Sequence, residues 1–92
     1  MYEEKELLNL LIEKIEYQIK INKDNLKAAK QDTKKLIKSK DDLIETGIDD
    51  YVFDDKIKYL HDVREKLNNR IYVLKKIKYR LDVAKRMLEE LN

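Results

Sequence analysis

The side chains that could perform covalent or acid–base chemistry are very few in this chain. It contains one histidine, His61, one serine, Ser39, and no cysteine among its 92 residues. Nucleophilic catalysis needs a nucleophile, a base beside it and a third group that orients the base. That set cannot be assembled here. We therefore predict a protein without enzymatic activity, small-molecule substrate or cofactor, in which His61 is a surface or seam-edge residue and not a metal ligand.

Acidic side chains gather in the middle of the chain, where they could suggest a divalent metal. Residues 41–55 include seven acids and no base: Asp41, Asp42, Glu45, Asp49, Asp50, Asp54 and Asp55. A calcium loop needs oxygen ligands at alternate positions around a central glycine, with a glutamate at its end. Gly47, the only glycine, precedes most of these aspartates, so the order is wrong. The sequence predicts no metal site here, but an acidic tip that could contact a basic partner.

Basic side chains dominate the stretches on either side of that tip. Residues 17–40 carry eight bases and two acids, and residues 56–88 carry eleven bases and three acids, although the whole chain has a net charge of only +2. One row of lysines follows helical spacing: Lys20, Lys23, Lys27, Lys30 and Lys34. This row could bind an anion such as nucleic acid, with an affinity that falls steeply with salt. A solvated lysine face explains the row slightly better, because lysine stems cover apolar seams.

Leucine recurs at every seventh position in the second half of the chain, at Leu60, Leu67, Leu74, Leu81 and Leu88. This heptad spacing places the side chains on one face of a helix. A leucine-zipper regulator of transcription would need a dense basic helix just before this row, where the chain has the acidic residues 49–55. We therefore interpret the row as a packing seam, and nucleic acid as a less favoured partner than protein.

The first half of the chain has a matching seam with alternating steps of four and three residues. Its members are Leu8, Ile12, Ile15, Ile19, Asn22, Leu26, Ala29, Thr33, Leu36, Lys40 and Leu43. Polar seam residues such as Asn22 and Thr33 lower stability but can fix the register of a coiled coil. Because the chain has no proline and one glycine, the two seams predict two long helices that pack on each other.

Gly47 is the one point at which the helical pattern breaks. We predict an all-α fold of one domain, residues 1–92: an antiparallel helical hairpin with helices over residues 3–45 and 50–91 and a turn over 46–49. In such a hairpin the numbers of facing residues add to about 95.

The residues around the break have the types that end one helix and begin the next. Gly47 can take the left-handed conformation that ends a helix, with Ile48 folding back on the last turn. Asp49 and Asp50 are suitable N-caps for the second helix. We expect Tyr51, Val52 and Phe53 to pack across the turn.

Each predicted helix carries further apolar side chains away from its seam. They are Leu7, Leu10, Tyr17 and Ile21 in the first helix, and Tyr72, Tyr79, Val83 and Met87 in the second. A hairpin brings both sets to the end that holds the termini, and exposed apolar surface on a small protein marks an interface. We predict that two hairpins form a homodimer with a four-helix bundle there, or that another protein docks there. Ordinary exposed tyrosines lying over lysine stems are the remaining alternative.

The sequence shows no segment that would place the protein in a membrane. Spanning a bilayer takes about 20 apolar residues, and residues 1–4 lack the positive charge of a signal peptide. We expect a cytoplasmic location, in the producing or host cell. The abundance of Lys, Ile, Asn and Tyr fits an A/T-rich gene, as in phages and other mobile elements.

These features favour one class of function over two others. We predict a non-catalytic protein-interaction module, for example a phage- or mobile-element-encoded modulator or inhibitor of a host protein. The alternatives are a nucleic-acid-associated protein that binds through the basic stretches, and a structural or assembly rod.

Overall fold

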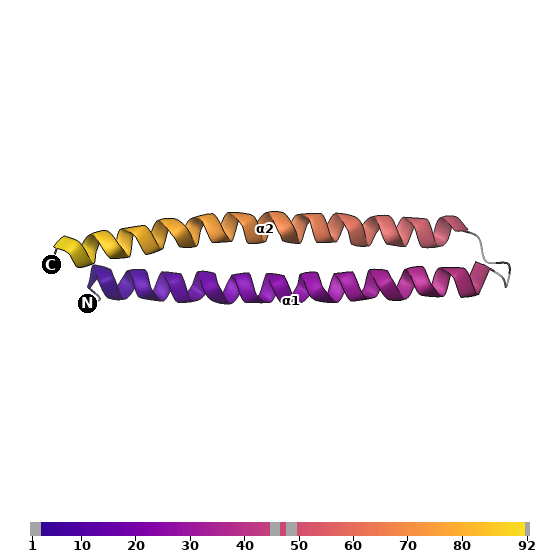
Figure 1. Ribbon diagram of the computed structural model, residues 1–92, viewed down its shortest axis with the longest axis horizontal. Helices are drawn as coiled ribbons and strands as arrows, with labels where there is room; N and C mark the ends of the chain where they lie inside the picture. Colours follow the sequence, from indigo (N-terminus) through magenta and orange to yellow (C-terminus); the bar gives the residue numbers. More distant parts are fainter. Residues whose placement is uncertain (1–2, 45–46, 48–49, 92) are drawn as a thin grey trace. The chain divides into compact units, whose positions relative to one another are not determined.

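The fold is all-α in the residues described by the computed structural model, which are 3–44, 47 and 50–91. The two helices are α1 (Glu4–Ile44) and α2 (Asp50–Leu91), labelled in Figure 1. Their ends agree within one residue with the predicted ranges. Glu4 and Glu6 lie in the first turn of α1, where carboxylates interact favourably with the positive end of the helix dipole.

Ion pairs between α1 and α2 show that the helices run antiparallel. They join Lys5 Nζ to Glu89 Oε1 at 3.6 Å, Lys78 Nζ to Glu16 Oε1 at 3.4 Å, and Lys40 Nζ to Asp54 Oδ1 at 2.8 Å. In each pair the residue numbers add to 94, which is close to the predicted sum. The antiparallel helical hairpin is therefore confirmed. Exposed ion pairs of this kind contribute only about 0–1 kcal/mol to stability. They therefore show which residues of α1 and α2 face each other but add little to the stability of the fold.

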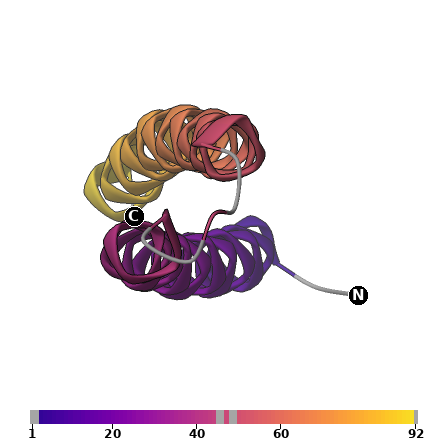
Figure 2. The ribbon, with the colours of Figure 1, turned by 90° about the vertical axis from the view of Figure 1, so that its right-hand side faces the viewer.

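The chain packs as two compact units, each containing a segment of both helices. The terminal unit comprises Met1–Lys23 and Asn69–Asn92, and the turn unit comprises Asp24–Asn68. Within each unit the α1 segment and the α2 segment lie alongside each other (Figures 1 and 2).

In the described residues, most of the core of both units lies along the predicted seams, and Phe53 and Ile71 are buried as well although neither was predicted as a seam residue. The buried residues are Ile12, Ile19, Asn22 and Ile71 in the terminal unit, and Ala29, Thr33, Phe53 and Leu67 in the turn unit. Every predicted seam position of α1 between residues 8 and 40 is buried or half-buried. On α2, Leu67 is buried and the other four leucines of the heptad row are half-buried. The heptad interpretation is confirmed for both helices.

The two polar seam residues satisfy their hydrogen-bonding groups within their own helix. Asn22 Nδ2 donates to the carbonyl oxygen of Gln18 at 2.7 Å, and Thr33 Oγ1 donates to that of Ala29 at 2.8 Å. Both are bonds to the residue four positions earlier, which Ser, Thr and Asn side chains commonly make inside helices. These two bonds therefore do not join α1 to α2.

Gly47 has a φ angle of +90°, in the region that favours glycine. A Cβ added there would meet no atom within 4 Å, so the requirement for glycine comes from the backbone and not from space. Phe53 is buried, as expected. The other predictions for this segment concern Glu45, Ile48 and Asp49, and the side chains of Leu43, Asp50, Tyr51 and Val52, which lie outside the described part of the structure.

Candidate protein-binding surface

Exposed apolar side chains concentrate in the terminal unit. Twelve large apolar side chains are exposed among those described, and ten of them belong to this unit. They are Leu7, Leu10, Leu11 and Tyr17 on α1, and Tyr72, Val73, Ile77, Tyr79, Met87 and Leu91 on α2. The turn unit supplies the remaining two, Ile37 and Tyr59. We call the ten residues the apolar surface.

The α1 part of the apolar surface forms a shallow depression of about 410 Å³. Its lining consists of Leu7, Leu10, Leu11, Glu13, Lys14 and Tyr17. Spacings of three and four residues place these side chains on neighbouring turns of one helix. Leu7 and Tyr17 are 51% and 62% exposed, so the depression is open to solvent and apolar along most of its length.

The α2 part contains two tyrosines and a methionine that are at least 60% exposed: Tyr72, Tyr79 and Met87. The Lys76 ammonium lies 4.7 Å from the centroid of the Tyr72 ring, a cation–π contact that a basic surface readily provides. Tyr72 therefore has a lysine beside it, as the alternative of ordinary surface tyrosines expects.

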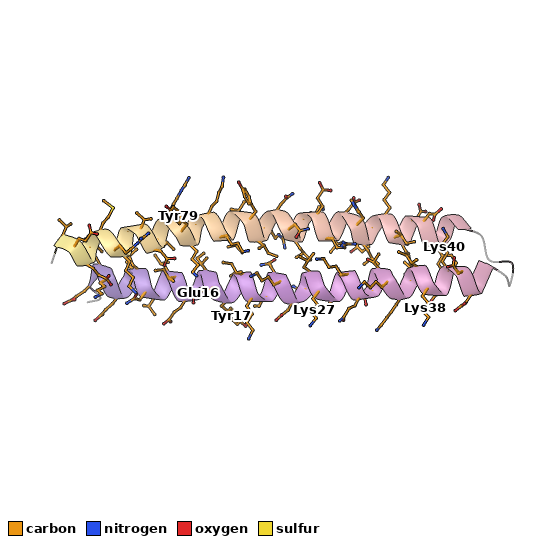
Figure 3. The ribbon with its side chains drawn as sticks, viewed as in Figure 1. Glu16, Tyr17, Lys27, Lys38, Lys40 and Tyr79 are labelled. Carbon is orange, nitrogen blue, oxygen red and sulfur yellow. The ribbon has the colours of Figure 1, made fainter. Side chains whose placement is uncertain are left out.

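Tyr17 and Tyr79, one from each part of the apolar surface, point in different directions. In Figure 3, Tyr17 lies on the side of α1 that faces away from α2, and Tyr79 lies on the side of α2 that faces away from α1. Glu16, next to Tyr17, points toward α2 and pairs with Lys78 there. Adjacent residues of α1 therefore differ in environment: Glu16 is paired with α2, whereas Tyr17 is exposed on the opposite side of α1.

Six of the eight residues predicted to form the interface are exposed in the structure. The other two, Ile21 and Val83, are half-buried. The predicted interface set does not contain Leu11, Val73, Ile77 or Leu91, yet all four are exposed. Leu11 could have been found from its spacing, because it follows Leu7 by four residues.

The lysine row is exposed along its whole length. Lys20 and Lys23 belong to the terminal unit, and Lys27, Lys30 and Lys34 to the turn unit. Figure 3 shows Lys27 on the side of α1 away from α2. These side chains are accessible to an anion, and they are equally well placed to be hydrated.

Four residues of the acidic tip are exposed: Asp41, Asp42, Asp54 and Asp55. Asp54 already accepts a hydrogen bond from Lys40, so part of the negative charge is used within the turn unit. The remaining tip residues, Glu45, Asp49 and the side chain of Asp50, lie outside the described part of the chain.

His61 has two acidic neighbours on its own helix, Asp62 and Glu65. Possible ligand atoms of His61, Asp62 and Glu65 lie within 4.8 Å of one another, and all three residues are exposed. Spacings of three and four residues on one helix account for this proximity. The group is open to solvent and makes no enclosed site.

Neither α1 nor α2, over the residues described, holds a segment with the length and apolarity needed to span a bilayer. Comparison of the chain with protein-family models, with curated proteins and with solved structures gives no match.

Proposed function

We propose that this protein is a non-catalytic protein-interaction module that binds through the apolar surface of its terminal unit. The observation that carries the proposal is the placement, in that unit, of ten of the twelve exposed large apolar side chains in the part of the chain that the structure describes. Scattered apolar residues on a protein surface need no explanation, whereas a concentration of them is typical of an interface.

The types of the exposed residues support this proposal. Tyrosine is enriched at the energetic centres of protein interfaces, where a few residues carry most of the binding energy. Tyr17, Tyr72 and Tyr79 are each 60–66% exposed, so they retain most of their contact area for a partner. The abundance of Lys, Ile, Asn and Tyr, which fits an A/T-rich gene, extends the proposal to a mobile-element-encoded modulator of a host protein.

The proposal is tested by placing charges on the α2 part of the apolar surface. The double variant Tyr72→Glu, Tyr79→Glu should reduce association roughly tenfold or more, because each interface tyrosine contributes about 1–2 kcal/mol or more. Association is measured as protein captured from the source cell and as the molar mass of the purified protein. Both positions are exposed, so the helical content should stay the same.

Tyr59→Glu is the matched control, because Tyr59 is 67% exposed and lies in the turn unit. It should leave both capture and molar mass unchanged. Unchanged capture and mass in the double variant would refute the proposed binding surface.

A further inference from the structure

The apolar surface of the terminal unit contains two faces, one on each helix, whose surroundings carry opposite charge. We define the α1 face by Leu7, Leu10, Leu11 and Tyr17, and the α2 face by Tyr72, Val73, Tyr79 and Met87. All eight side chains are exposed. A charged partner that is attracted to one face is therefore repelled by the other face.

The α1 face is acidic after the internal ion pairs are set aside. Lys5 and Glu16 pair with α2, which leaves four acids and two bases among residues 3–20. They are Glu3, Glu4, Glu6 and Glu13 against Lys14 and Lys20. All six are exposed, so a net charge of −2 is presented to solvent around the apolar side chains.

The α2 face is basic by the same reckoning. Lys78 and Glu89 pair with α1, which leaves six bases and two acids among residues 70–90. They are Arg70, Lys75, Lys76, Arg80, Lys85 and Arg86 against Asp82 and Glu90. The net charge is +4, and Lys76 stands directly over the ring of Tyr72.

Both faces are apolar and they carry opposite charge, so each face is complementary to the other. Two α1 faces would bring acids together, and two α2 faces would bring bases together, which disfavours either contact between copies. An α1 face against an α2 face of another chain buries apolar side chains and sets acids beside bases. The chain carries both halves of one interface.

The exposed side chains of the α2 face supply part of the area that such a contact needs. Tyr72 and Tyr79 alone expose roughly 200–300 Å², against the ~800 Å² that one partner contributes to a typical interface. Val73, Met87 and the aliphatic stems of the neighbouring lysines and arginines lie on the same helix and add to this area.

From this charge complementarity we infer that a second copy of this chain covers the apolar surface, with its α1 face against the α2 face of the first copy. The inference rests on the proposed function and names the partner. Because Tyr17 and Tyr79 point away from each other (Figure 3), each contact leaves one α1 face and one α2 face free. A heterologous contact of this kind continues to further copies, whereas a closed four-helix dimer would need both faces on one side.

The test uses one variant of each face, studied alone and mixed. Leu10→Lys with Tyr17→Lys blocks the α1 face with the charge of its partner face, and Tyr72→Glu with Tyr79→Glu blocks the α2 face in the same way. Sedimentation equilibrium of the wild type should give a mass that rises with concentration beyond two chains. Each variant alone should remain a single chain. An equimolar mixture should restore a 1:1 complex, because one variant supplies an intact α1 face and the other an intact α2 face.

Three results would overturn the inference: a wild type that stays a single chain up to millimolar concentration, a blocked variant that still self-associates, or a mixture that forms no complex. Failure here is distinguishable from failure of the proposed function. If the wild type is a single chain while Tyr72→Glu with Tyr79→Glu loses a captured protein that Tyr59→Glu retains, the surface binds a different protein and only the inference about a second copy fails. Circular dichroism of each variant confirms that the helices are retained.

Discussion

Replacing Ile71 with alanine lowers the free energy of unfolding by about 2–4 kcal/mol. Ile71 is 8% exposed and is the α2 residue buried within the terminal unit. Truncating it removes apolar contacts and leaves a cavity that a narrow seam can fill only in part. Stabilities of small domains are about 5–15 kcal/mol in total, so this single change removes a large fraction. Urea unfolding followed by circular dichroism, at one low protein concentration, measures the effect.

Ile37→Ala is the matched control for this substitution. Ile37 is 48% exposed, so little packing is lost, and alanine has the higher helix propensity. We expect a change of less than about 1 kcal/mol. Equal losses at the two positions would mean that residue 71 is not part of a packed core.

Replacing Asn22 with leucine raises the free energy of unfolding by about 1–2 kcal/mol. Asn22 is 8% exposed, and its amide donates a hydrogen bond to Gln18 of the same helix. Removing a buried polar group together with its local bond is close to neutral, while leucine adds buried apolar area and a better helix propensity. The midpoint of urea unfolding should therefore rise at constant slope.

Thr33→Val tests the same idea with nearly unchanged volume. The Thr33 hydroxyl donates its hydrogen bond within its own helix, to the carbonyl oxygen of Ala29. The free energy of unfolding should therefore rise, by less than in Asn22→Leu. A loss of stability in Asn22→Leu would show that the amide holds the two helices together. A gain in stability accompanied by several coexisting masses would show that Asn22 fixes the register, as buried asparagines do in coiled coils.

The hairpin could be predicted because its determinants are local. Heptad spacing identified the seam, and Gly47 identified the break through a backbone conformation that other residues avoid. Antiparallel pairing then follows from chain connectivity alone, and the ion pair between Lys5 and Glu89 lies where that pairing places it.

The extent of the apolar surface was harder to predict because it depends on what stands opposite each residue. Leu91 is not in the predicted interface set, yet it is 83% exposed. Pairing that sums to 94 places it opposite Glu3, which precedes α1, so almost no helix covers it. Ile77 is placed opposite Tyr17, whose side chain points away (Figure 3). The spacing of residues within one helix does not show what lies opposite Leu91 or Ile77 on the other helix.

The reversal of the chain at Gly47 is the claim on which the rest depends, because it brings the α1 and α2 faces into one unit. The chain has no cysteine, so spin labels can be attached specifically to the variant Glu4→Cys, Glu90→Cys. Labelled protein diluted in excess unlabelled protein restricts the measurement to pairs within one chain.

Electron–electron double resonance should then give a distance below about 25 Å, since packed helices lie about 8–10 Å apart and the label arms add the rest. A chain that continues as one unbent helix would separate the labels by about 130 Å. Loss of the short distance would contradict the account.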